Sequence, residues 1–178
     1  IAQFRAACPA ARIVYLEGNH EKRIQRFLDE KATHAAEIRA VNDERKALGI
    51  PRLLALDDLD VEYIAPYGTS LYLANRIRAT HGDKVRSGGG ATTKAVVAEA
   101  RVSTVFGHIH RVESACRTVY GPKGKQVITA VSPGCLCDPK QTPAASSDLD
   151  WQQGFARCWY DNDNDFWELY QIVNGTTA

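Results

Sequence analysis

The chain has 178 residues, and its 22 Lys and Arg residues nearly balance its 21 Asp and Glu residues. This balance gives no overall attraction to nucleic acid or to a membrane surface, and no apolar run is long enough to span a bilayer. The length fits one domain over residues 1–178, with a buried core. Five cysteines that lack the spacing of a disulfide framework favour a reducing, cytoplasmic location.

Strands and helices alternate in the first half of the chain. An apolar run at 12–16 predicts a strand buried on both faces. The stretch 21–48 is rich in Ala, Glu, Lys and Arg, and its apolar spacing predicts one or two amphipathic helices, broken near Thr33 and ended by Gly49-Ile50-Pro51. The remaining predicted elements are a helical connector at 53–59 and strands at 61–64, 70–73 and 76–80, with a turn at Pro66-Tyr67-Gly68.

The second half of the chain is mostly strand. A glycine run, Gly88-Gly89-Gly90, precedes a predicted helix at 92–101 and a strand at 102–106. Because helices come early and strands late, the order favours a mixed α/β (α+β) fold over a uniform βαβ winding. Alternating segments predict two hairpins, one at 112–120 with 126–131 and one at 154–160 with 166–173.

Three short histidine-bearing segments each follow a predicted strand: Gly18-Asn19-His20-Glu21, Thr80-His81-Gly82-Asp83 and Gly107-His108-Ile109-His110. Loops at the strand tips of an open α/β sheet converge at one edge, where ligands collect. In an extended segment, His108 and His110 would point to the same side. Neutral imidazoles and an amide oxygen are suitable ligands for a divalent transition metal. The three segments therefore predict a metal site.

The order of these segments resembles that of the calcineurin-like metallophosphoesterases, whose signature ends in Gly-Asn-His-Asp/Glu, His and Gly-His-x-His. The resemblance implies a four-layer αββα sandwich, in which two sheets pack face to face with the site at one edge. It also implies two divalent metal ions that activate water against a phosphate ester, with Mn2+ favoured and Fe, Zn, Ni or Mg as alternatives. The turn Ser132-Pro133-Gly134 resembles the segment that follows the last motif in this family.

The resemblance also implies a role for each site residue. Asn19, His81 and His108 would ligate the second metal, and His110 would ligate the first. His20 would stabilise the transition state or protonate the leaving oxygen. Glu21 would hold the imidazole ring of that histidine.

The first two elements of the family signature, Asp-x-His and Gly-Asp-x-x-Asp, are absent. Only 18 residues precede Asn19, and the first aspartate of the sequence is Asp29. The resemblance therefore implies a sequence that begins partway through the domain, without its first strands and helices. Such a chain is expected to be poorly active alone, because its metals would lack carboxylate ligands. Its exposed sheet edge would favour association into oligomers. A natural protein that has lost half of its site is the alternative.

Three basic residues near the histidines are candidate substrate ligands. Lys84 and Arg86 stand beside the glycine run, whose backbone amides at a helix N-terminus would cradle a phosphate. A flexible surface loop is the competing interpretation. Arg111, beside His110, would clamp a phosphate oxygen, or it would be a solvated surface arginine.

Several other residues favour a structural interpretation. Cys135 and Cys137 have no partner pair at zinc spacing, so core packing is favoured for them. The other three cysteines are expected to be buried as small apolar residues. His34 lies in a charged helical segment and is expected to be exposed. The three tryptophans lie near predicted strands and are expected to be core or edge aromatics.

The predicted function is that of a metal-dependent hydrolase of phosphate esters. Phosphodiesterase or nuclease-like activity on a nucleotide or nucleic acid is favoured over protein phosphatase activity, because long charged helices at 21–48 replace the compact loops expected around a phosphoprotein groove. The alternative from another class is a catalytically inactive binding or assembly module with the same fold. A nucleic-acid-binding domain without catalysis would need a basic stripe, which the near-neutral composition disfavours.

Overall fold

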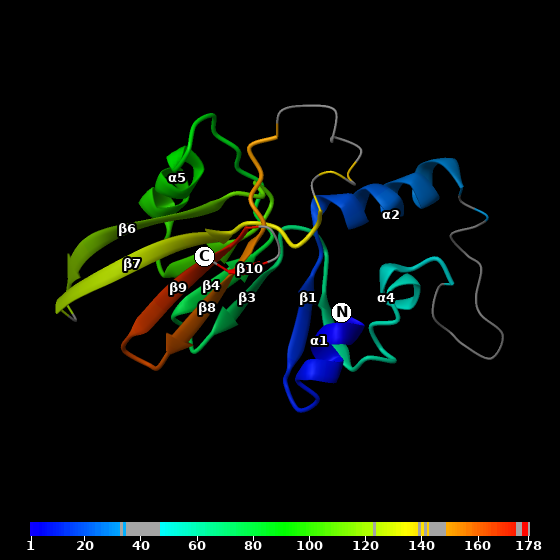
Figure 1. Cartoon of the computed structure of the whole chain (residues 1–178), viewed down its shortest axis with the longest axis horizontal. Helices are drawn as coiled ribbons and strands as arrows, with labels where there is room; N and C mark the ends of the chain where they lie inside the picture. Colours follow the sequence, from blue (N-terminus) through cyan, green and yellow to red (C-terminus); the bar gives the residue numbers. More distant parts are fainter. Residues whose placement is uncertain are drawn as a thin grey trace. The chain divides into compact units, whose positions relative to one another are not determined.

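In the computed structural model the chain forms two compact units, residues 1–69 and 70–178, and each is described by itself. The structure describes residues 1–32, 34, 47–122, 124–138, 140, 142, 149–173 and 176–177. Within these residues it contains four helices, a mixed five-stranded sheet and two smaller sheets (Figure 1). The predicted mixed α/β fold class is confirmed at this level.

The first unit contains a parallel pair of strands and three helices. Strands β1 (Ile13–Leu16) and β2 (Val61–Ile64) pair in register along their whole length. The helices are α1 (Ala2–Ala7), α2 (Asn19–Lys31) and α4 (Ile50–Leu53). The short helix α1 has no counterpart among the predicted elements.

Two details of the first unit were not predicted. All four residues of β1 are half-buried, so the expectation of a strand buried on both faces is wrong. The Gly49-Ile50-Pro51 segment begins helix α4, with Gly49 as the N-cap, and the end of the helix predicted before it lies outside the described residues. Proline is well tolerated in the first helical turn because the N–H that it lacks would have no partner there. The connector expected at 53–59 is a series of turns after α4, and the part of the predicted helix at 35–46 lies outside the described residues.

The second unit is built on the five-stranded sheet, with the order β3-β4-β5-β7-β6. The central pairs β4–β5 and β5–β7 are parallel, and the outer pairs β3–β4 and β6–β7 are antiparallel. A second, antiparallel sheet has the order β10-β9-β8. The strands are β3 (Ser70–Leu73), β4 (Ile77–Thr80), β5 (Ser103–Phe106), β6 (Val112–Gly121), β7 (Gly124–Pro133), β8 (Gly154–Tyr160), β9 (Asp165–Val173) and β10 (Thr176–Thr177). Both predicted hairpins are confirmed.

Helix α5 (Ala91–Glu99) covers one face of the five-stranded sheet, over β5, β6 and β7 (Figure 1). Between the helix and the sheet lies a core of buried apolar side chains: Val97, Phe106, Ile109, Ile128 and Ala130. This core fixes the β5 tip, from which two of the predicted ligands extend.

The two sheets of the second unit share an apolar cleft of about 500 Å³. One wall comes from the five-stranded sheet through Leu73, Ile77 and Val105, and the other comes from the β8–β9 hairpin, which includes Cys158 and Trp167. None of the helices in the described part of the chain is both long enough and apolar enough to cross a lipid bilayer.

Candidate functional site

His81 and His108 lie together at the carboxyl edge of the five-stranded sheet. Strands β4 and β5 run parallel with Thr80 opposite Phe106, so the segments that follow the two strands leave the sheet at the same edge. The ladder continues one step further, because the Gly107 N–H donates to the His81 carbonyl oxygen at 2.9 Å. The two imidazole rings meet edge to face, with centroids 5.4 Å apart. The structure therefore brings together two of the predicted ligands.

The segment that carries His108 and His110 is not extended, and this part of the prediction is wrong. Both histidines have left-handed backbone conformations, with φ of 70° and 59°. The Ile109 N–H donates to the Gly107 carbonyl oxygen at 2.8 Å, which closes a three-residue γ-turn centred on His108. A γ-turn with a positive central φ is rare and strained. Strained backbone of this kind is concentrated at functional sites.

Burial of Ile109 gives a physical reason for this turn. Its side chain is 7% exposed and belongs to the core that also contains Phe106. A straight continuation of β5 would place successive side chains on alternate faces. The two left-handed residues instead turn the chain, so that Ile109 enters the core while the histidines on either side of it stay half-buried.

His110 lies against Trp151, a contact that the sequence did not predict. The imidazole and indole rings meet edge to face at a centroid distance of 4.0 Å. The adjacent Gln152 holds this arrangement through two hydrogen bonds: its N–H donates to the His110 carbonyl oxygen at 2.8 Å, and its Oε1 accepts from the Val112 N–H at 3.1 Å. No local pattern signals this contact, because the chain returns to this region only after 40 residues, the separation of Val112 and Gln152.

The donors at this edge are imidazole nitrogens, which suit borderline transition metals such as Mn2+, Fe, Zn and Ni. Two imidazoles supply part of a divalent site, which normally takes three or four protein ligands. Within the described ranges no three His, Cys, Asp or Glu side chains form a group that would hold one ion. The residue types fit the predicted metals, but the two imidazoles at this edge are only part of the ligands that a divalent ion needs.

Asn19, His20 and Glu21 form the first turn of helix α2, in the first unit. The Glu21 carboxylate accepts hydrogen bonds from the Gly18 N–H at 2.9 Å and from the Tyr15 hydroxyl at 2.8 Å. It thus satisfies a backbone donor at the helix start, where a negative charge is also favoured by the helix dipole. Burial and the hydrogen bond to Glu21 raise the pKa of the Tyr15 phenol.

The hydrogen bonds of Glu21 to Gly18 and Tyr15 show a capping role, while its predicted role in holding the His20 ring stays a prediction. His20 is exposed at the helix start. Asn19 and His20 belong to residues 1–69, whereas His81, His108 and His110 belong to residues 70–178. That the amide and the imidazoles share one site therefore also stays a prediction.

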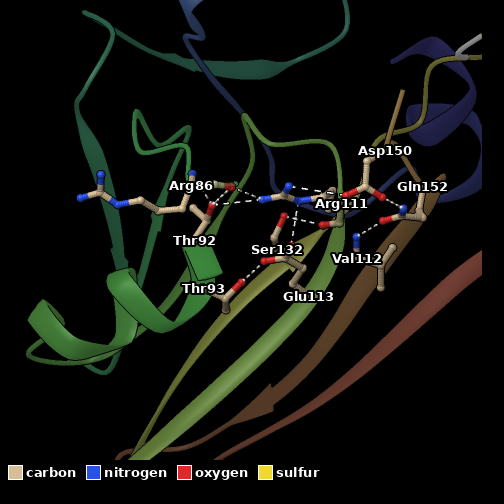
Figure 2. Close-up of polar contacts among 9 residues, drawn as sticks. All are labelled: Arg86, Thr92, Thr93, Arg111, Val112, Glu113, Ser132, Asp150 and Gln152. Carbon is tan, nitrogen blue, oxygen red and sulfur yellow. Dashed lines mark hydrogen bonds and ion pairs between the residues drawn. The ribbon is translucent and has the colours of Figure 1, made fainter. Parts of the chain in front are cut away.

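Arg111 is buried, with 9% of its surface exposed, so the expectation of a solvated surface arginine is wrong. Its guanidinium contacts four other residues (Figure 2). The Nε atom lies 2.7 Å from Glu113 Oε1, and Nη2 donates to the Arg86 carbonyl oxygen and to Thr92 Oγ1, each at 3.1 Å. Nη1 lies 3.6 Å from Asp150 Oδ2. The predicted phosphate-clamping role stays a prediction, and it would require some of these contacts to open.

Buried hydroxyl groups complete this network. The Thr93 hydroxyl donates to Glu113 Oε2 at 2.6 Å, and the Ser132 hydroxyl donates to the Arg111 carbonyl oxygen at 2.7 Å. Thr92 Oγ1 also accepts from the Arg86 N–H at 2.9 Å. Arg111 and Glu113 face each other as an ion pair, and this neutralisation, with the hydrogen bonds around it, makes such buried charges tolerable.

Lys84 and Arg86 differ in their surroundings. The Lys84 ammonium pairs with the Glu99 carboxylate at the end of α5, and its hydrogen bond to that group holds the pKa of Glu99 below its usual value. Arg86 is exposed, while its backbone is held at both N–H and carbonyl. The glycine run ends at Gly90, whose φ of 75° makes it a left-handed N-cap of α5. Both basic residues stay candidate substrate ligands.

The cysteines only partly follow the prediction. Cys8 and Cys116 are exposed, so their expected burial is wrong, and Cys158 is half-buried. Cys135 is half-buried and Cys137 is exposed. Alternation along β6 explains Cys116, because its neighbours at even positions face solvent while Glu113 and the odd positions face inward. The expected exposure of His34 is confirmed.

Comparisons of this chain with protein-family models, with curated proteins and with solved structures gave no significant match.

Proposed function

We propose that this protein is a metal-dependent hydrolase of phosphate esters, of the calcineurin-like metallophosphoesterase type. The carrying observation is the pair of imidazoles of His81 and His108, 5.4 Å apart at the carboxyl edge of a parallel strand pair. The left-handed backbone at His108 and His110 supports it, because the fold tolerates strain at these two histidines. The proposal includes the four-layer sandwich, which the apolar cleft between the two sheets of the second unit supports.

In this proposal His81 and His108, with Asn19, hold one divalent ion, and His110 belongs to the ligands of another. When bound, such ions polarise a phosphoryl oxygen and lower the pKa of a bound water. His20, exposed at the first turn of α2, is the proposed proton donor to the leaving oxygen. Lys84 and Arg86 are proposed to bind the phosphate ester of a nucleotide or nucleic acid.

Metal binding provides the first test. The 178-residue chain, freed of metal, is titrated with Mn2+ by isothermal titration calorimetry, beside the variants His108→Ala and His34→Ala. Loss of His108 is expected to weaken Mn2+ binding by more than the roughly 10–100-fold that loss of an outer-sphere partner costs. The control variant, at an exposed position in the first unit, is expected to bind as the unmodified chain does. Equal effects of both substitutions would place the metal elsewhere.

Hydrolysis provides the second test, with bis(p-nitrophenyl) phosphate as a diester and p-nitrophenyl phosphate as a monoester. We expect Mn2+-dependent turnover that is slow, because the histidines and Asn19 provide no carboxylate ligand, and faster on the diester. The variants Asn19→Ala and His20→Ala are expected to abolish it. Mn2+ binding that depends on His108 without turnover on either ester would favour the alternative, a catalytically inactive binding or assembly module.

A further inference from the structure

We infer that Arg111 is a positioning residue, which orders the loop that follows His81 and the segment that places Trp151 on His110. The contacts described for its side chain are to Arg86, Thr92, Glu113 and Asp150, none of which is a candidate metal ligand. It acts through the backbone segments that it joins. The consequence for metal binding rests on the proposed function, whereas the ordering of the two segments does not.

The guanidinium joins three parts of the second unit that are distant in sequence. It reaches the loop between β4 and α5 at the Arg86 carbonyl, 25 residues away, and the first turn of α5 at Thr92, 19 residues away. It also reaches Asp150 in the segment after β7. Figure 2 shows these contacts converging on one buried side chain. Two of the three segments border the candidate metal ligands.

Arg111 is coupled to the Trp151–His110 contact through the residues on either side of the indole. Asp150 Oδ1 accepts a hydrogen bond from Gln152 Nε2 at 2.9 Å. The backbone of Gln152 is bonded in turn to the His110 carbonyl oxygen. The Asp150 carboxylate is 65% exposed, so its ion pair is the weaker contact of Arg111. The part-buried hydrogen bond to Arg86 and the buried one to Thr92 are the stronger contacts.

The chemistry requires an arginine here. A guanidinium presents five N–H donors in a rigid planar fork, so it bonds a carboxylate, a carbonyl and a hydroxyl at the same time. A lysine ammonium would preserve the charge opposite Glu113, but its single nitrogen would not reach all these acceptors. The variant Arg111→Lys therefore separates positioning from charge pairing.

The experiment measures amide hydrogen exchange by mass spectrometry on the metal-free 178-residue chain. In Arg111→Lys, peptides covering 81–90 and 149–153 are expected to exchange at least about ten-fold faster, because their hydrogen bonds lose their anchor. Arg117→Lys is the matched control. Arg117 lies on β6, shortly after Arg111 in sequence, and donates to two backbone carbonyls, those of Val97 and Ala100 at the other end of α5. This control is expected to leave both peptides unchanged.

A double variant guards against simple loss of folding. Removing Arg111 alone would leave Glu113 buried without its ion-pair partner, which lowers stability. Arg111→Met with Glu113→Gln removes both charges, while the amide oxygen at 113 still accepts from Thr93. We expect this double variant to recover most of the thermal midpoint lost by Arg111→Met. The fast exchange at 81–90 and 149–153 is expected to persist, because the bonds to Arg86 and Thr92 are not restored.

Metal affinity and kinetics connect the inference to the proposed function. Arg111→Lys is expected to weaken Mn2+ binding by up to roughly 10–100-fold, the range for losing an outer-sphere partner, because the segments beside His81 and His110 lose their anchor. If the chain binds no Mn2+, the proposed function fails while the exchange result still tests positioning. Two results would overturn the inference. One is normal protection of both peptides in Arg111→Lys or in the double variant. The other is a raised KM for the diester with unchanged Mn2+ affinity, which would make Arg111 a phosphate ligand.

Discussion

His108 occupies a backbone conformation that a residue with a Cβ adopts at a cost of about 1–2 kcal/mol. Its φ of 70° lies in the left-handed region. Glycine has no such cost, so His108→Gly should be more stable than His108→Ala, by about 1 kcal/mol, in urea unfolding. Both variants should lose Mn2+ affinity equally. This result would show that the strain at position 108 comes from its backbone conformation and not from the imidazole that binds the metal.

The exposed strand position Ser114 provides the control for that comparison. There the order should reverse, because glycine in a strand interior loses entropy and has no compensating conformational advantage. If alanine were also the more stable residue at position 108, the strained γ-turn would not exist in solution.

Gly134 is required for a different reason, which is close approach of the backbone. A Cβ at this position would lie 2.5 Å from the Gln152 carbonyl oxygen and 2.8 Å from Val112 Cγ2, and φ is 86°. Gly134→Ala should therefore lower the free energy of unfolding by about 2–4 kcal/mol. Because Gln152 also holds His110, Mn2+ affinity should fall with it.

Gly121, at the end of β6, is the matched control for this substitution. A Cβ there would meet nothing within 4 Å. Gly121→Ala should change the free energy of unfolding by less than about 0.5 kcal/mol, the usual range for surface changes. A comparable loss of stability in both variants would show that the backbone at Gly134 is not tightly packed against Gln152.

At the scale of elements, the β1–α2 junction combines a strand end, a helix cap and a half-buried phenol. Burial and the bond to Glu21 raise the pKa of Tyr15, so the folded state favours the neutral phenol. The resulting stabilisation is fully present below the unfolded pKa of about 10 and is lost as the pH rises above it. Tyr15→Phe should lower the free energy of unfolding, measured by urea unfolding at about pH 7, where the bond exists, by about 1 kcal/mol or less.

Between about pH 9 and pH 11 the unmodified chain should lose more stability than Tyr15→Phe. Only the unmodified chain has the Tyr15 phenol, which ionises in the unfolded state in this range while the folded state keeps it neutral. Tyr120→Phe, at a position that is 80% exposed, should leave the pH dependence unchanged. Parallel pH profiles for all three chains would contradict the Tyr15–Glu21 bond.

Elements with strong local signals were predictable, and those set by tertiary context were not. The β6–β7 and β8–β9 hairpins follow from alternation and turn residues, and α5 follows from a glycine run before a helical segment. The extended conformation expected for residues 107–110 failed because burial of Ile109 overrides the strand pattern. The sequence marks a glycine before two histidines, and it does not show which way the chain turns.

At the scale of the whole molecule, the candidate site depends on long-range placement. That strand tips carrying His81 and His108 would meet at one edge of a sheet was predictable from the sequence. The parallel pairing of β4 with β5 is what brings the two histidines together. The burial of Arg111 was not foreseeable, because its partners come from segments up to about 40 residues away. The residues next to an arginine in sequence do not distinguish one on the surface from a buried one with many polar contacts.

The cysteines test how the two sheets of the second unit pack. Cys135 and Cys158 line the apolar cleft between those sheets. Burial, and then the neighbouring Cys137, raise the pKa of Cys135 to about 12, while burial and the Asp165 charge raise that of Cys158 to about 11. Since the thiolate is the reactive form, both should alkylate slowly at about pH 8.

Pulsed iodoacetamide labelling at about pH 8, followed by peptide mass spectrometry, measures the five rates. Exposed Cys8 and Cys116 should react at least about ten-fold faster than Cys135 and Cys158, even after the higher intrinsic nucleophilicity of a more basic thiolate is allowed for. Labelling in urea should remove the difference. Equal rates in the folded chain would mean that the β8–β9 hairpin does not cover the five-stranded sheet, because both thiols line the cleft between them.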